Sequence, residues 1–291
     1  MARTAPTANT FITMAEILDA LSSPFFRAAF LAGLLASVSF GIVGSYVVTK
    51  RITAIAGAIA HCALGGIGLA LYAQRVLGWQ WCDPMLGALV FAVGSAMVIG
   101  VISLKQSERE DTVIGALWAA GMAIGILAIK KIPGYVRLDS WLFGDMTIVT
   151  MHDVWMIAAL GTVIIILTLL FHSRFVAVCF DEEFARVRGI PVPFYYLLLL
   201  CMTAVTVVLL VRVVGIIMVI ALVTLPAAVA SQFARHLWQM MLLAIVLCAF
   251  FVVTGLGLSI HWNTVSGPAV ILVATVVYLM VLLWKRIIRS P

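Results

Sequence analysis

The amino-acid sequence predicts an all-α protein that crosses a membrane many times. Hydrophobic residues make up 64% of the 291 residues and charged residues only 10%, and the mean hydropathy is +1.19. A water-soluble domain of this size carries more charge than this. The apolar residues also gather in runs of about 20, the length of helix that crosses roughly 30 Å of hydrocarbon.

Nine such apolar segments follow the first 23 residues. They cover 26–48, 52–73, 85–104, 113–129, 154–171, 194–211, 213–233, 240–260 and 267–284. The seventh begins directly after the sixth, so eight spans are an alternative. We expect residues 1–23 to form a tail with a short helix at the membrane surface, and residues 24–291 to form one transmembrane domain.

Small residues are frequent within these segments. Gly65, Gly66 and Gly68 lie in the second, and Gly121 and Gly125 form a GxxxG spacing in the fourth. Such residues let helix backbones approach closely in lipid, where water exclusion does not drive packing. The pattern therefore predicts a tightly packed helical bundle.

The cations favour one side of the membrane. If the loop 173–193 is cytoplasmic, 11 of the 18 lysines and arginines share its side, at positions 50, 51, 105, 109, 174, 186, 188, 235, 285, 286 and 289. Cytoplasmic loops carry such an excess, so the net charge of +6 needs no nucleic-acid partner. The N-terminus is then outside and the C-terminus in the cytoplasm.

The loop 173–193 holds the densest group of charges. Asp181, Glu182, Glu183, Arg186 and Arg188 fall within eight positions, and each would cost roughly 2.5–3.5 kcal/mol at the bilayer centre. Phe180, Phe184 and Val187 recur at spacings of four and three, so a helix here has one apolar stripe and one charged face, closed by Gly189 and Pro191. This pattern fits a docking surface, and an ordinary solvated loop is the alternative.

His61 is the one ionisable side chain near the middle of a predicted span, and no Asp or Glu falls inside one. Ionisable residues within membranes are costly and often functional, and a neutral imidazole is a common transition-metal ligand. The alternative is a structural histidine bonded to a neighbouring helix. His261 and Asn263 lie at an outer segment end, where they are candidates for an entry vestibule, and His172 is expected to be solvated at a cytoplasmic end.

Five motifs in order resemble the membrane permeases of ABC importers for zinc, manganese and iron. They are SYVVTKRITAIAGAIAHCALGGIGLAL, REDTVIGALWAAGMAIGILAI, LDSWLFGDM, FDEEFARVRGIPV and VVGIIMVIALVTLPAAVA, and the resemblance covers residues 24–286. It implies a permease bundle of the type found in metal and cobalamin importers. It also implies a multi-pass protein of the bacterial inner membrane that works as a homodimer by alternating access.

The resemblance further implies partners and roles for the residues above. A separate cytoplasmic ATP-binding subunit would dock on a coupling helix containing Asp181, Glu182, Glu183, Phe184, Arg186, Arg188 and Gly189. An extracytoplasmic metal-binding protein would deliver the ion, and lipid would surround the bundle. The chain has no GxxxxGK[ST] phosphate loop, so we expect it not to be an enzyme and to hold no permanent cofactor.

Two departures from the family pattern bear on the metal. By the resemblance, His61 matches the histidine of the family's metal pathway. Gly57 stands where many members carry an Asp one turn before that histidine, and Asn263 and Val265 stand where an Asp and a Pro are frequent. An imidazole without a nearby carboxylate suits zinc better than manganese. We therefore expect His61 to contact a divalent ion on the transport path, with zinc as the first expectation and manganese or iron after it.

Two other classes of function fit parts of the sequence. A secondary metal-ion transporter or channel would work without an ATPase, but would usually show acids or broken helices at the bilayer midplane. A non-transporting membrane scaffold would use His61 only for packing.

Overall fold

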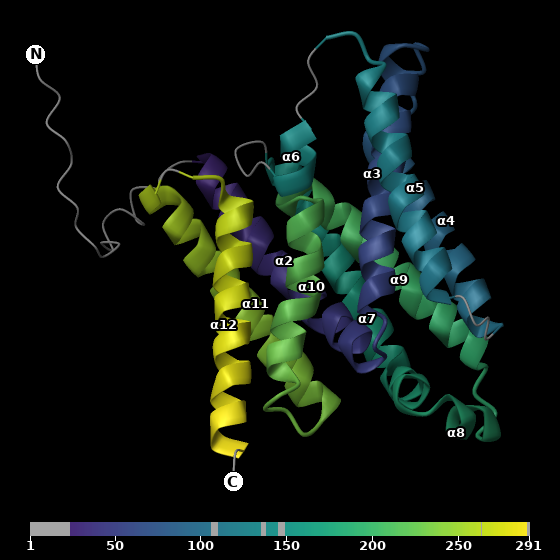
Figure 1. Ribbon diagram of the computed structural model, residues 1–291, viewed down its shortest axis with the longest axis vertical. Helices are drawn as coiled ribbons and strands as arrows, with labels where there is room; N and C mark the ends of the chain where they lie inside the picture. The colour runs from purple at the N-terminus through teal and green to yellow at the C-terminus, as the bar shows by residue number, and fades with distance from the viewer. Residues whose placement is uncertain (1–23, 106–109, 135–137, 145–148, 263, 290–291) are drawn as a thin grey trace, which may run out of the picture.

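The computed structural model describes residues 24–105, 110–134, 138–144, 149–262 and 264–289, and its regular elements in these ranges are all α-helices (Figure 1). In chain order they are α2 (Pro24–Thr49), α3 (Thr53–Arg75), α4 (Pro84–Leu104), α5 (Glu110–Lys130), α6 (Leu138–Phe143), α7 (Met151–Phe180), α8 (Glu182–Val187), α9 (Val192–Val214), α10 (Ile216–Ala230), α11 (Leu237–Trp262) and α12 (Ser266–Arg289). The predicted tail 1–23 lies outside the described residues.

Eight of these helices are long and apolar enough to cross a membrane, namely α2, α3, α4, α5, α7, α9, α11 and α12. This confirms the predicted all-α polytopic fold. The predicted seventh span corresponds to α10, which has only 15 residues and is about 22 Å long. Gly215, at a φ of 83°, separates α10 from α9.

The short helix α10 still runs through most of the bundle beside α12. At its start, Gly215 lies against Gly144. The preceding residue, Phe143, contacts Gly267 at the beginning of α12, so the starts of α10 and α12 lie close together. Beyond its end, the Gln232 side chain accepts a hydrogen bond from Lys285 Nζ near the end of α12 at 3.2 Å. The choice between eight and nine passes therefore depends on this one 15-residue helix.

The helix before the charged loop is longer than the sequence predicts. We expected the span to end at Phe171 and the loop to begin at Ser173, but α7 continues to Phe180. Phe175, Val178 and Cys179 are buried against the bundle, and hydrophobic burial keeps this stretch helical. The exposed charged segment therefore begins only at Asp181.

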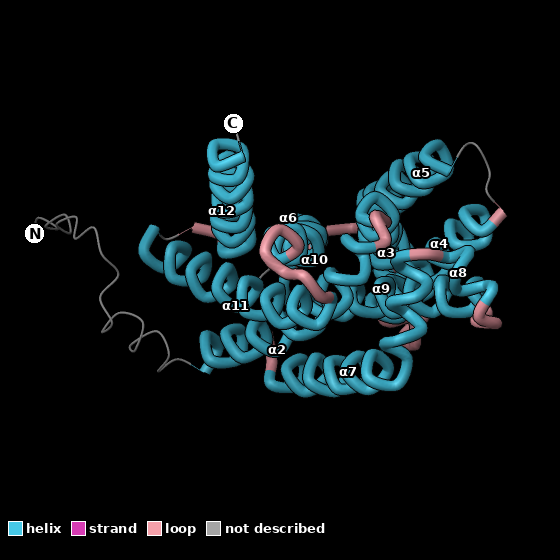
Figure 2. The backbone as a smooth tube through the Cα atoms, turned by 90° about the horizontal axis from the view of Figure 1, so that it is seen from below, coloured by secondary structure: helices cyan, strands magenta, loops and turns pink. Residues whose placement is uncertain are grey.

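Helix α3 lies at the centre of one half of the bundle, packed between α4 and α5 (Figure 2). Its glycines bring the backbones together as the small residues predict. A Cβ added at Gly66 would lie 2.0 Å from the Gly87 carbonyl oxygen of α4, and one at Gly125 of α5 would lie 2.6 Å from the Leu64 carbonyl oxygen of α3. The other half is built on α2, which packs against α7, α10 and α11.

Replacing Gly66 by alanine is expected to destabilise the bundle by about 1–3 kcal/mol or more, because the new methyl group meets backbone that no side-chain rotation can move. Thermal unfolding in detergent should occur at a lower temperature. The matched control is Gly94→Ala on the neighbouring α4, where an added Cβ meets nothing within 4 Å. Equal unfolding temperatures for the two variants would contradict the close α3–α4 contact.

The predicted cytoplasmic loops gather at one end of the bundle. There Lys50 pairs with Glu182, Tyr196 Oη donates to Ser103 Oγ at 3.1 Å, and Lys285 bonds to Gln232. The opposite end carries α6, against which Gly215 and Gly267 pack. Cation-rich loops therefore share one end, and α8 projects from that end (Figure 1).

Candidate functional site

Local hydrogen bonds at both ends define the short helix α8. Asp181 is its N-cap, since its Oδ1 accepts a hydrogen bond from the Phe184 amide at 2.9 Å. At the other end the Ile190 amide donates to the Ala185 carbonyl at 3.0 Å and the Gly189 amide to the Arg186 carbonyl at 2.9 Å. Gly189 has a φ of 73°, so these bonds form a Schellman motif that needs a left-handed residue.

The last residue of α7 and helix α8 together expose an apolar stripe, called here the apolar stripe of α8, and charged side chains. Phe180, Phe184 and Val187 are 68%, 51% and 87% exposed. Glu183 and Arg186 are also exposed, and Ala185 is the buried residue of the helix. Exposed apolar side chains grouped in this way mark a protein contact when they lie in water. The geometry therefore favours a docking surface over an ordinary solvated loop.

His61 lies in the middle of α3 and is 8% exposed. Its ring stacks on the indole of Trp118 from α5, with ring centroids 4.5 Å apart and planes inclined by 21°. Its Nδ1 atom is buried and has no hydrogen-bond partner among the described residues. A buried imidazole nitrogen without a partner is available to a ligand, and in the part of the chain that the structure describes no neighbouring helix donates or accepts a hydrogen bond at this nitrogen.

Trp118 also occupies the space next to Gly57. A Cβ at Gly57 would lie 2.9 Å from Cζ3 and 3.1 Å from Cη2 of the indole. The missing side chain at position 57 therefore makes room for Trp118 to cover His61. Among the described residues no group of three His, Cys, Asp or Glu side chains is arranged to hold a metal ion.

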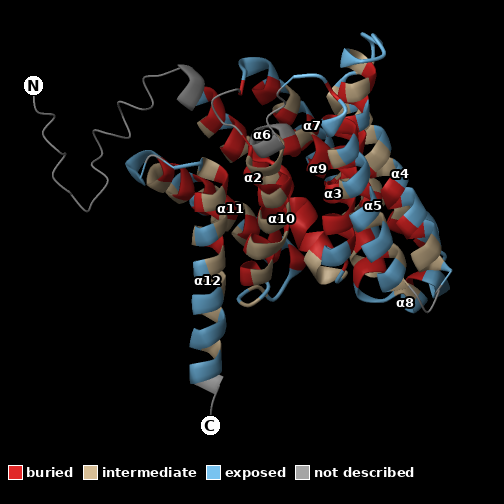
Figure 3. Cartoon of the chain, turned by 45° about the horizontal axis from the view of Figure 1, so that its top comes forward, coloured by how far each residue is buried: buried red, intermediate tan, exposed pale blue. Residues whose placement is uncertain are grey.

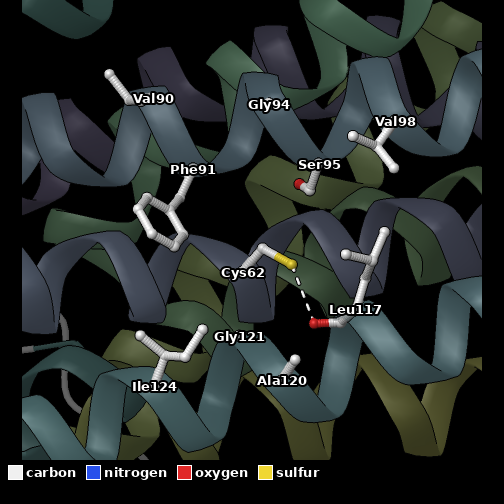
Figure 4. A pocket seen from close by; sticks show the side chains of 10 residues that line it. All are labelled: Cys62, Val90, Phe91, Gly94, Ser95, Val98, Leu117, Ala120, Gly121 and Ile124. Atoms are coloured by element: carbon white, nitrogen blue, oxygen red, sulfur yellow. Dashed lines mark hydrogen bonds between the residues drawn. The ribbon is translucent and has the colours of Figure 1, made fainter.

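A cavity of about 300 Å³ lies beside this pair of residues, between α3, α4 and α5 (Figure 4). Cys62 points into it, and its Sγ donates to the Leu117 carbonyl at 3.2 Å. Ser95 also lines the cavity but donates its hydroxyl proton to the Ala92 carbonyl at 2.9 Å. The other lining side chains are apolar, so the cavity offers no charged ligand for an ion.

The remaining sequence-predicted residues lie apart from His61. His261 is exposed at the end of α11, and Asn263 lies outside the described residues, so a vestibule formed by the pair stays a prediction. His172, which we expected to be solvated, is only partly exposed. Its Nδ1 is 3.0 Å from Tyr46 Oη, and its ring lies 4.4 Å from that of Trp238, because α7 continues past it along the bundle.

A Gly57→Asp substitution is expected to lower the yield of folded protein, because its side chain must displace the Trp118 indole. Combining it with Trp118→Ala removes the clash and places a carboxylate one turn from His61. We expect the double variant to recover the yield and to favour manganese more than wild type does, since carboxylates suit manganese. The yield is measured by size-exclusion chromatography, and the preference by competitive uptake of manganese and zinc. A double variant that keeps the wild-type preference would contradict the prediction that a carboxylate at position 57 reaches the metal bound by His61.

The fold is that of a multi-pass membrane protein. A family model described as the ABC 3 transport family matches residues 22–285, and the chain belongs to this family. The match confirms the sequence resemblance to the permease subunits of metal ABC importers.

Relatives and a solved structure agree with this family. The chain is 36% identical to a "Probable metal transport system membrane protein" of Chlamydia trachomatis, over 94% of this chain and 93% of the relative. It is 31% identical to the "Manganese transport system membrane protein MntC" of Listeria monocytogenes, over 89% and 90%. The structure of PsaBC from Streptococcus pneumoniae in complex with Fab superimposes with a TM-score of 0.81 at 28% identity, covering 92% of this chain and 95% of that one.

Proposed function

We propose that the chain forms the ion path of an ATP-driven importer for a divalent transition metal ion. The observation that carries this proposal is the exposed apolar stripe of α8, at the cation-rich end of the bundle. A surface of this kind on a metal ABC importer permease fits the ATP-binding subunit. The chain itself would then hydrolyse no ATP and hold no resident cofactor, the ion being its cargo.

His61 is the residue we propose for contact with the ion. Its unpartnered Nδ1 supplies a nitrogen ligand, and the indole of Trp118 covers the ring. Access to it would require α3 and α5 to move relative to one another, which suits alternating access between two packed arrangements. Zinc remains our first expectation from the imidazole chemistry, while the name of the Listeria relative favours manganese.

A second copy of the chain is proposed on the side where α5 and α12 project beyond the rest of the bundle (Figure 2). The exposed face of α5 consists largely of small residues, namely Thr112, Gly115, Ala116, Ala119, Ala120 and Ala123. Such a face lets another helix approach closely. The C-terminal half of α12 is also largely exposed (Figure 3), and lipid would cover the apolar surface that the second copy leaves free.

The opposite end, with α6, would receive the extracytoplasmic metal-binding protein. This assignment puts the N-terminus outside and the C-terminus in the cytoplasm of a bacterial inner membrane, as the distribution of cations favours. A secondary transporter or channel is not favoured for a member of this family, and its test is whether flux occurs without ATP.

The assembly is tested by purifying the chain in detergent with its candidate ATP-binding subunit and measuring the mass by light scattering. We expect a particle of two permease and two ATP-binding chains. A chain that stays monomeric and binds no ATP-binding subunit would contradict the proposal.

A further inference from the structure

Lys50 connects helix α8 to the core of the bundle. Lys50 follows the last residue of α2, and its side chain is only 15% exposed. Its ammonium group donates to the Val178 carbonyl at 3.1 Å and to the Glu182 carboxylate. It also lies 5.8 Å from the centre of the Tyr196 ring in α9.

These contacts hold both sides of the junction between α7 and α8. Val178 lies in the last turn of α7, where carbonyl groups lack helical partners and a cation is favourable. Glu182 is the first residue of α8. The ammonium of Lys50 therefore bonds the end of one helix and the start of the next, and fixes where α8 leaves the bundle.

Lys50 is also connected rigidly to α3, the helix that carries His61. Only Lys50, Arg51 and Ile52 separate α2 from α3. The turn is closed by hydrogen bonds from the Lys50 amide to Tyr46 and from the Ile52 amide to Val47, at 2.8 and 3.0 Å. Arg51 has a φ of 63°, a region that a non-glycine residue keeps only where its surroundings hold it.

We propose that Lys50 is a positioning residue that transmits movement of α8 to the start of α3. This inference rests on the proposed function, in which the ATP-binding subunit moves α8. A displaced Glu182 would pull on Lys50, and the short turn would carry that displacement into α3, eight residues before His61. Helix α8 also packs on α7 and α9, and α9 contacts α3, but Lys50 bonds α8 directly to the turn that starts α3.

Helix α8 does not need Lys50 in order to form. Its cap by Asp181 and its end at Gly189 are local, and Glu182 keeps Arg186 at 3.8 Å on the next turn. Loss of the ammonium should therefore leave the docking surface intact and remove only its connection to α3. Binding of the ATP-binding subunit and coupling of its ATP hydrolysis to transport become separable measurements.

The test uses the complete complex in liposomes and measures ATP hydrolysis and uptake of radioactive metal on the same sample. Lys50→Met keeps the length of the side chain and removes its charge. We expect it to retain the ATP-binding subunit and to hydrolyse ATP, while metal taken up per ATP falls by about tenfold. Lys50→Arg should restore most of the uptake, because it returns a buried cation that donates hydrogen bonds.

The control is Arg235→Met, which removes an exposed cation at the same end of the bundle but outside this turn and should leave uptake per ATP unchanged. Uptake per ATP at the wild-type level in Lys50→Met would overturn the inference while the proposed function stands. If Lys50→Met does not fold, Glu182→Gln tests the same ion pair from α8. Wild-type uptake per ATP in Glu182→Gln would likewise overturn the inference. Absence of ATP-driven uptake in the wild-type complex would instead refute the proposed function.

Discussion

The His61→Ala variant is expected to fold and to bind its ATP-binding subunit, but to lose metal uptake by about tenfold or more. His61 is the histidine in the middle of α3, and no group of three His, Cys, Asp or Glu side chains among the described residues could replace it as a ligand site. Removing its imidazole leaves the ion with backbone and apolar neighbours at that depth. Uptake of zinc, manganese and iron into liposomes measures the effect.

Two controls separate this role from packing. His236→Ala removes an exposed imidazole at the end with the cytoplasmic loops and should transport like wild type. His61→Gln retains polarity and most of the contact with Trp118 but not the imidazole, so it should fold like wild type and still fail. Normal transport by His61→Ala would reduce His61 to a packing residue stacked on Trp118.

The Phe184→Asp variant is expected to lose the ATP-binding subunit. Phe184 is half exposed and lies in the centre of the apolar stripe on α8, the position where an aromatic anchor contributes most to binding. Loss of such an anchor costs about 2 kcal/mol or more, and so weakens binding by about thirtyfold. Co-purification of the two subunits, followed by titration of one into the other, measures the loss.

Phe233→Asp is the matched control for this docking surface. Phe233 is 57% exposed and lies beyond α10, at the same end of the bundle but outside α8. The Phe233→Asp variant should bind the ATP-binding subunit as wild type does. Equal weakening by the two variants would mean that α8 has no special part in docking, and unchanged binding by Phe184→Asp would remove the observation on which the proposed function depends.

The sequence predicts the helices well because bilayer thickness sets their length. Each long apolar run became a helix near its predicted place, and charges located the loop that contains α8. The prediction was least accurate where tertiary packing decides. Burial of Phe175 and Val178 extends α7, and a glycine at position 215 shortens α10.

The sequence identifies the residues of the candidate site but not their contacts. His61 stands out because it is ionisable within an apolar run, yet nothing in the pattern joins it to Trp118, 57 positions later. The pairing of Lys50 with Glu182 joins positions 132 apart. The charge pattern places both residues in cytoplasmic loops but does not predict that they pair. Contacts of this kind depend on which helices are neighbours, so the fold was needed to find them.

Accumulation of metal in sealed liposomes tests the central claim most directly. Liposomes holding the chain with its ATP-binding subunit are given radioactive zinc, manganese or iron together with the extracytoplasmic metal-binding protein, with ATP or a non-hydrolysable analogue on the cytoplasmic side of the complex. The account predicts accumulation of one of these metals that requires ATP hydrolysis and is lost in His61→Ala. Equal accumulation with the analogue, or by the chain without its ATP-binding subunit, would contradict it.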